Sequence, residues 1–315
     1  MRAPPPRGVS QGAGIVWLHV NGKRGGRSSG PGGTKITIDG RMPRFLGIGR
    51  YIADKKGNVK GKDRPGLSLA RHRLHWEDLG ELDPLWAILT RRDRRYGKWQ
   101  VEEFFLTGDE DIRLLMRAAE RFRLPAQHDW ALDFGCGVGR LTRALSRYFE
   151  ACCGVDISLA MLRRARELNR QFPNCLFLMN GEDDLRIFRD GSFDLVYSGL
   201  VLQHMPRREV VFSYISEFFR VLKRDGLLVF QLPDRVPLRH QIHQLRARTY
   251  EVLRRLRVHS SFLYRTFGLS PITMLGVPET EVRRHLTQLG AKLLSVEADT
   301  GCPASFRSRR YSITK

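Results

Sequence analysis

Short apolar runs alternate with amphipathic segments along the second half of this 315-residue chain. Continuous apolar runs of this length are typical of strands buried on both faces of a parallel sheet. The segments between them repeat apolar residues every three or four positions, which predicts helices. Strands are expected at 130–134, 151–156, 175–179, 192–198 and 227–232, and helices at 140–148, 158–170 and 206–222. This alternation predicts an α/β fold whose parallel sheet has helices on both faces.

Two more apolar segments follow a helix expected at 278–289. Residues 291–298 and 307–314 predict an antiparallel hairpin, which brings the expected sheet to seven strands. Upstream, Thr107 is a candidate cap for a helix over 109–122, because its apolar positions fall on one face.

A glycine-rich turn joins the first strand to the first helix of the alternating region. Residues 133–139 read Asp-Phe-Gly-Cys-Gly-Val-Gly. Glycine tolerates positive φ and lets a ligand approach the backbone, and the helix that follows offers free N–H groups. Asp156 ends the next strand. A carboxylate about 20 residues past such a turn can bind both hydroxyls of a ribose.

The spacing of the glycines decides which nucleotide is expected. The dinucleotide fingerprint is G-x-G-x-x-G, whereas this chain has G-x-G-x-G preceded by Asp133. That carboxylate would repel a pyrophosphate, so a ligand with a ribose, a cationic amino group and no phosphate fits better. The segment resembles motif I of the class I S-adenosylmethionine-dependent methyltransferases, and Asp156 resembles their ribose-binding acid.

The resemblance continues from about residue 109 to residue 315. The acidic turn at 180–185, the fourth strand at 192–198, the loop at 202–206 and the segment at 220–227 follow in the order of that family. Where the family usually has Pro-Gly-Gly, residues 224–226 read Arg-Asp-Gly, and Gly226 is expected to cap the preceding helix. The resemblance implies a Rossmann-like, seven-stranded, mostly parallel sheet with a C-terminal antiparallel hairpin.

The resemblance also implies S-adenosyl-L-methionine as the cofactor. Asp156 is expected at the ribose, Ile157 against the adenine, and Glu182 at the adenine amino group. A helix cap is the structural alternative for Asp133 and Asp156. The full set of implied cofactor-binding residues is Asp133, Gly135, Cys136, Gly137, Gly139, Asp156, Ile157, Gly181, Glu182, Asp183 and Ser198.

His204 is the candidate catalytic residue, because it follows the fourth strand at the edge of the sheet where ligands bind. An imidazole can remove a proton near neutral pH. The alternative is that His204 only lines the pocket, as in relatives with varied substrates. The sequence has no Asn/Asp-Pro-Pro-Tyr/Phe and no Pro-Cys after this strand, which argues against DNA amino- and cytosine-C5-methyltransferases.

Composition divides the chain into three regions. Residues 1–70 are rich in Gly and Pro and carry 14 Lys/Arg against three Asp, so they predict a disordered basic tail. Residues 71–107 form an expected aromatic-rich N-terminal cap. Residues 108–315 form the expected methyltransferase domain, with a helical insert at 233–277. The insert contains a basic amphipathic segment at 238–258. Such a segment can contact a membrane or an acidic substrate, or its charges can form an ordinary solvent-exposed face.

The formal net charge is +21, and nucleic acid is one class of partner that such a charge would attract. The sequence contains no run of 18 apolar residues, so it predicts no transmembrane helix. Its first residues lack the apolar core of a signal peptide. The five cysteines contain no C-x-x-C pair, so we expect reduced thiols in a cytoplasmic protein and no metal site. The oligomeric state is not specified.

Three functions compete. The favoured one is methyl transfer to an O or N nucleophile of a small-molecule acceptor, such as a sugar, a polyketide or a lipid-linked intermediate. The second is an RNA or protein methyltransferase that the basic tail guides to its substrate. The third is a non-catalytic S-adenosylmethionine-binding protein.

Overall fold

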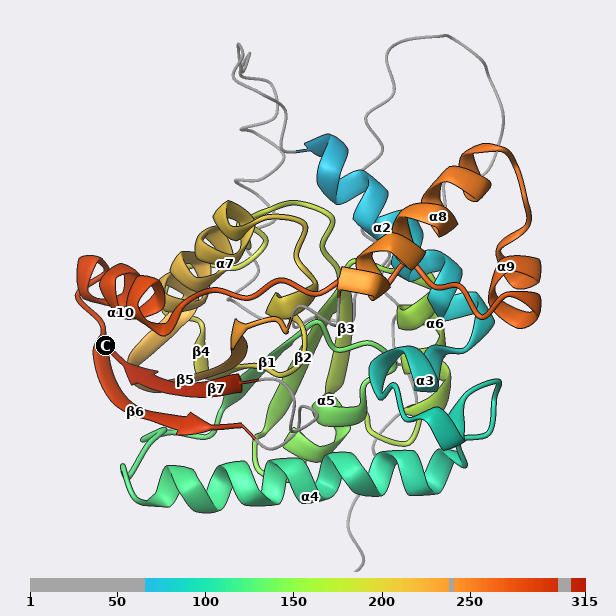
Figure 1. Ribbon diagram of the computed structural model, residues 1–315. Coiled ribbons are helices and arrows are strands. Elements are labelled where there is room, and N and C mark those ends of the chain that lie inside the picture. Colours follow the sequence, from blue (N-terminus) through green and yellow to red (C-terminus); the bar gives the residue numbers. More distant parts are fainter. Residues whose placement is uncertain (1–65, 238–240, 300–306) are drawn as a thin grey trace, which may run out of the picture.

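A seven-stranded sheet forms the centre of the molecule in the computed structural model, which describes residues 66–237, 241–299 and 307–315 (Figure 1). The strand order is β3-β2-β1-β4-β5-β7-β6. The first five strands pair in parallel, and β7 pairs antiparallel with both β5 and β6. The bounds are β1 (Trp130–Phe134), β2 (Ala151–Asp156), β3 (Cys175–Met179), β4 (Phe193–Ser198), β5 (Leu222–Arg235), β6 (Lys292–Ala298) and β7 (Arg307–Thr314). The predicted fold class is confirmed.

Helices cover both faces of this sheet, because alternate residues of each strand point to opposite faces. Leu132 of β1 packs in the core cluster that contains α7 and α10, whereas Ala131 packs in the cluster that contains α4 and α5. The helices are α2 (Gly66–Leu82), α3 (Pro84–Ile88), α4 (Val101–Glu120), α5 (Arg140–Leu145), α6 (Leu159–Leu168), α7 (Arg208–Val221), α8 (Gln241–Arg255), α9 (Ser260–Thr266) and α10 (Glu279–Gln288), with short 3-10 turns η1 (Arg92–Arg94) and η2 (Leu202–His204).

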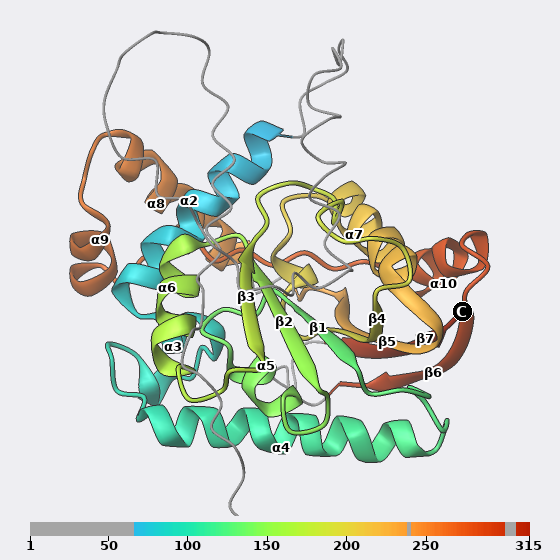
Figure 2. The ribbon, with the colours of Figure 1, turned by 180° about the vertical axis from the view of Figure 1, so that it is seen from behind.

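The N-terminal helices and the insert pack against each other although they are far apart in the sequence. Asp78 of α2 accepts hydrogen bonds from the hydroxyl of Tyr250 at 2.8 Å and from the guanidinium of Arg254 at 3.0 Å, both on α8. Asp83 accepts one from the hydroxyl of Tyr264 on α9 at 2.8 Å. Figures 1 and 2 show α2, α8 and α9 at the same edge of the molecule.

A second contact ties α2 to the sheet region. The carboxylate of Glu77 accepts hydrogen bonds from the backbone N–H groups of Leu159 and Ala160, each at 2.8 Å. These are orphan donors of the first turn of α6, which directly follows the end of β2. The N-terminal helix is therefore held in place over the carboxyl end of the second strand.

Two predicted helix caps, Thr107 and Gly226, are wrong. Helix α4 begins at Val101, and the Thr107 hydroxyl donates to the Phe104 carbonyl inside that helix instead of capping it. The fully buried Phe104 and Phe105 give the earlier turns their own apolar face, so the helix extends upstream. Gly226 is not a helix cap, because α7 ends at Val221 and β5 begins immediately at Leu222.

The structure describes only part of the predicted N-terminal tail. Residues 1–65, most of the predicted tail, lie outside the described residues, and α2 begins at Gly66, five residues before the predicted boundary. In the ranges that the structure describes, no helix is both long and apolar enough to cross a membrane.

Candidate functional site

The glycine turn after β1 takes a backbone path that other residues rarely adopt. Gly135 and Gly137 have φ angles of 75° and 54°. A Cβ atom on Gly135 would lie 2.3 Å from a methyl group of Val201, and one on Gly137 would lie 2.5 Å from Cδ1 of Ile88. Glycine is required here both for the backbone angles and for the close approach of these side chains.

Asp156 ends β2 beside this turn. Its Oδ2 atom accepts a hydrogen bond from the N–H of Gly137 at 2.8 Å, and its Oδ1 atom accepts one from the N–H of Ser158 at 2.9 Å. Burial raises the pKa of Asp156 to about 6, against the effect of these hydrogen bonds. Each carboxylate oxygen has two acceptor sites, so both can still accept a hydroxyl group from a ligand.

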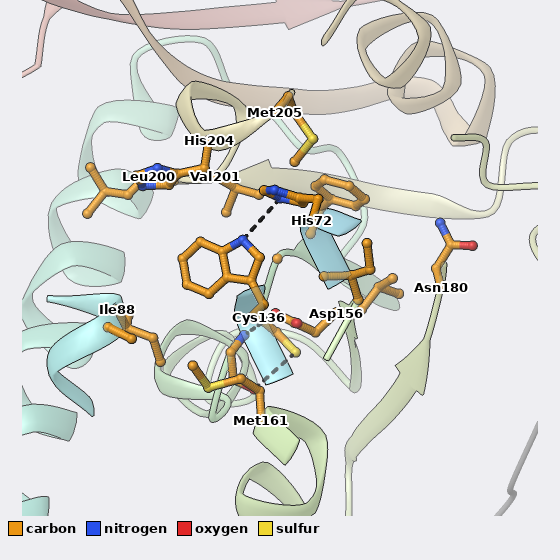
Figure 3. A pocket seen from close by; sticks show the side chains of 18 of the residues that line it. His72, Ile88, Cys136, Asp156, Met161, Asn180, Leu200, Val201, His204 and Met205 are labelled. Carbon is orange, nitrogen blue, oxygen red and sulfur yellow. Dashed lines mark hydrogen bonds between the residues drawn. The ribbon is translucent and has the colours of Figure 1, made fainter. Parts of the chain in front are cut away.

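A pocket opens at the carboxyl ends of the parallel strands, and side chains of α2 and α3 form part of its wall (Figure 3). It is partly open to solvent. Its lining combines apolar side chains with a few polar groups, as small-molecule sites do. Six of the predicted site residues line it: Gly135, Cys136, Gly137, Asp156, Ile157 and His204.

The other six predicted residues do not line this pocket: Asp133, Gly139, Gly181, Glu182, Asp183 and Ser198. Asp133 is buried and accepts a hydrogen bond from the hydroxyl of Thr142 at 2.6 Å. Burial raises the pKa of Asp133 to about 6. This hydrogen bond joins Asp133 of β1 to α5.

The acidic turn after β3 is held through its backbone. The Tyr214 hydroxyl donates to the carbonyl of Glu182 at 2.5 Å, and the Asn180 side chain donates to the carbonyl of Asp184 at 2.8 Å. The Glu182 side chain itself is exposed. Asn180 of this turn and Tyr214 of α7 line the pocket instead.

The wall near β4 contains His204. Its Nδ1 atom lies 2.7 Å from the carbonyl oxygen of Thr273. Because a carbonyl can only accept, Nδ1 carries the proton, and Nε2 accepts from the side-chain amide of Gln203 at 3.2 Å. Burial lowers the pKa of His204 below its ordinary value. The imidazole is therefore neutral near pH 7, with its lone pair on Nε2.

Two side chains of α2 complete the wall opposite the strands. The indole N–H of Trp76 donates to Nε2 of His72 at 3.0 Å, and the Trp76 ring lies edge-on to the His204 ring at 5.5 Å between centroids. Burial lowers the pKa of His72 to about 3, so this ring is also uncharged near neutral pH. Neither His72 nor Trp76 was among the predicted site residues, although tryptophans are dense in this part of the sequence.

The described residues contain no group of three or more His, Cys, Asp or Glu side chains that could hold a metal ion. Asp156, the glycine turn and His204 are the predicted site residues that the pocket brings together.

Comparison with known proteins finds similarity to methyltransferases. The sequence model of the family described as "Methyltransferase domain" matches residues 132–230. The chain is 37% identical over 185 residues to a 2-methyl-6-phytyl-1,4-hydroquinone methyltransferase of Synechocystis, an alignment that covers 58% of this chain and 55% of the relative. It is 35% identical over 104 residues to a trans-aconitate 2-methyltransferase of Deinococcus radiodurans, covering 32% and 37% respectively. The alignments thus span about half or less of these relatives.

Among solved structures, the chain resembles the magnesium protoporphyrin IX methyltransferase of Synechocystis with bound S-adenosylhomocysteine. The TM-score is 0.51 at 18% identity, over 78% of this chain and 99% of the other. This likeness concerns the fold, and the matched sequence segment includes the glycine turn, Asp156 and His204. Residues 132–230 therefore form a methyltransferase domain, and the chain has the fold of the class I S-adenosylmethionine-dependent methyltransferases.

Proposed function

We propose that this protein transfers a methyl group from S-adenosylmethionine to an oxygen or nitrogen nucleophile of a small-molecule acceptor. The observation that carries the proposal is that the Asp156 carboxylate, the glycine turn and His204 all line one pocket. Relatives that are named as methyltransferases of a hydroquinone and of trans-aconitate agree with a small-molecule acceptor.

The residues present fit the cofactor. The Asp156 carboxylate has free acceptor positions for the two ribose hydroxyls. Ile157 offers an apolar contact for the adenine ring, and Asn180 lines the same pocket. Direct contacts from Glu182, Asp183 and Ser198 remain predictions from the family resemblance. When bound, S-adenosylmethionine supplies a methyl group on a sulfonium, which is already a good leaving group.

The protein then has to align the acceptor and manage one proton. We assign that proton to Nε2 of His204, which is unprotonated because Nδ1 donates to the Thr273 carbonyl. His204 takes the proton from the acceptor O–H or N–H as the nucleophile attacks, and becomes an imidazolium. Gln203 holds the ring by its contact with Nε2 at 3.2 Å, so the acceptor must displace or share this contact.

A small acceptor fits the pocket better than a polymer does. The lining near His204 comes from Trp76, Leu200, Val201 and Met205, which are mainly apolar, and from two neutral histidines. Such a lining favours an uncharged acceptor. The alternative of an RNA or protein acceptor depends on the basic residues of 1–70, and a non-catalytic protein would bind the cofactor without turnover.

The direct test is incubation of a cell extract with the protein and methyl-labelled S-adenosylmethionine, followed by mass spectrometry of separate small-molecule, RNA and protein fractions. We expect label in a small molecule, and none with the Asp156→Ala variant. Label in RNA or protein alone would favour the second function. Absence of label in every fraction, despite cofactor binding, would favour the non-catalytic protein.

A further inference from the structure

Helix α8 exposes an apolar stripe on the face that points away from the rest of the molecule. Leu245, Val252 and Leu256 at its end are between 54% and 69% exposed. Their spacing of seven and four residues places them on one side of the helix. The opposite side buries Ala247 and Tyr250, which anchor α8 to the body. The stripe is therefore not a core face.

The neighbouring helix adds two exposed aromatic rings. Phe262 and Phe267 are 50% and 56% exposed, and their rings contact each other edge-on at 5.4 Å between centroids. Exposed leucines occur singly on many proteins, whereas here five large apolar side chains are exposed on α8, on α9 and at the residues that directly follow these helices. We refer to these five residues as the α8–α9 surface.

The charges around the α8–α9 surface are positive and unpaired. Arg248, Arg255, Arg257 and Arg265 are exposed and form no ion pair or hydrogen bond with the residues that the structure describes. Other arginines nearby are engaged, since Arg254 binds Asp78. Glu251 is the only acidic residue between positions 241 and 277, and it faces Arg71 and His75.

We propose that the α8–α9 surface binds the interface of an anionic lipid bilayer. Leucine and phenylalanine side chains insert at the boundary of headgroups and acyl chains, and the arginines beside them reach the lipid phosphates. A bilayer accepts both groups without a matching shape. The core of a protein–protein interface, in contrast, is depleted in charged residues. This inference is independent of the proposed methyl transfer.

The α8–α9 surface lies on the same side of the molecule as one wall of the pocket. Helix α8 is fixed to α2 by the bond between Arg254 and Asp78, and α2 contributes His72 and Trp76 to the pocket. Figures 1 and 2 show α2 and α8 at the same edge. A bilayer at the α8–α9 surface would therefore lie on the α2 side of the pocket.

The test is co-sedimentation of the full chain with vesicles of phosphatidylcholine, with and without phosphatidylglycerol. One variant replaces the stripe (L245S/V252S/L256S) and another the arginines (R248Q/R255Q/R257Q). Matched controls replace exposed apolar residues of α4 (V101S/L106S/L114S) and unpaired exposed arginines elsewhere (R117Q/R170Q/R224Q). All variants keep residues 1–65, so the charge of that segment is constant. Circular dichroism and the thermal transition verify the fold of each.

We expect the protein to bind the anionic vesicles, with a partition coefficient roughly 10- to 100-fold lower in both α8 variants and unchanged in both controls. Equal binding by the α8 variants and the wild type would overturn the proposal and assign vesicle binding to the basic segment before residue 66. A stripe variant that binds vesicles normally but changes the molecular mass in solution would overturn it in favour of a second copy of this chain.

Discussion

The carboxylate of Asp156 accepts a hydrogen bond from the backbone N–H of Gly137 at 2.8 Å. This bond joins the end of β2 to the turn after β1, which are 19 residues apart in the sequence. The acceptor for a ribose and the turn beside it are thus one preorganised unit.

Replacing Asp156 with alanine should weaken binding of S-adenosylhomocysteine by about 10- to 100-fold, because hydrogen bonds to a charged group contribute roughly 1.5–3 kcal/mol. The Asn variant keeps one carbonyl oxygen and should lose less. Isothermal titration calorimetry measures both affinities. An Asp156→Ala protein that folds normally and binds with wild-type affinity would refute the ribose assignment.

The affinity for S-adenosylhomocysteine should also depend on pH. Burial raises the pKa of Asp156 to about 6, so the carboxylate becomes protonated as the pH falls through that value. A protonated carboxyl offers fewer acceptor positions, so affinity should decrease below about pH 6. The Asp156→Asn variant should show a flatter profile, whereas Asp133→Asn should keep the dependence. A flat wild-type profile would contradict the assignment.

The His204→Ala variant separates a base from a pocket wall. If His204 takes the proton, turnover at saturating cofactor should drop by roughly 10²- to 10⁴-fold, while cofactor affinity stays unchanged. Because burial lowers the pKa of His204, the wild-type rate should fall only as the pH drops below 6.5. The variant should lack this acid limb. A small loss confined to the acceptor KM would assign His204 to the wall.

The Glu77→Ala variant should destabilise the protein by about 1–2 kcal/mol, because two N–H groups at the start of α6 lose their acceptor. Glu81→Ala is the matched control. Glu81 lies one turn later on α2, and its one ion-pair partner among the described residues is the exposed Arg163, so its loss should stay within about 0.5 kcal/mol. Urea unfolding measures both, and equal losses would show that Glu77 does not act as this cap.

The strands were predictable because buried parallel strands are continuous apolar runs in the sequence. The bounds expected for β1, β2 and β3 agree with the structure. The start of α4 was not predictable in this way, since Thr107 and Gly108 resemble a helix boundary. Gly108 instead lies where a Cβ would come within 2.6 Å of the Arg140 carbonyl, so it marks close packing of α4 on α5.

Half of the predicted site residues line the pocket because they belong to local motifs at the ends of strands. His72 and Trp76 could not be placed from the sequence, since they reach the pocket only through the packing of α2 on α6. Asn180 directly follows β3 and could have been chosen from that position alone.

Removal of residues 1–65 should leave the thermal transition and S-adenosylhomocysteine binding unchanged, because their composition does not support a core. Removal of residues 1–70 should lower the transition temperature, because it deletes Leu69, which is 3% exposed and lines the pocket. Differential scanning calorimetry distinguishes the two. A large loss on removing residues 1–65 would show that this segment contributes to the folded core.

Calorimetric titration of the full-length protein with S-adenosylhomocysteine and, separately, with NADH tests the central claim most directly. The account predicts saturable binding of S-adenosylhomocysteine that is weakened in the Asp156→Ala variant. It predicts no comparable binding of NADH, because the glycine turn that follows Asp133 lacks the dinucleotide spacing. Binding of NADH with equal strength, or no binding of S-adenosylhomocysteine to the folded protein, would contradict it.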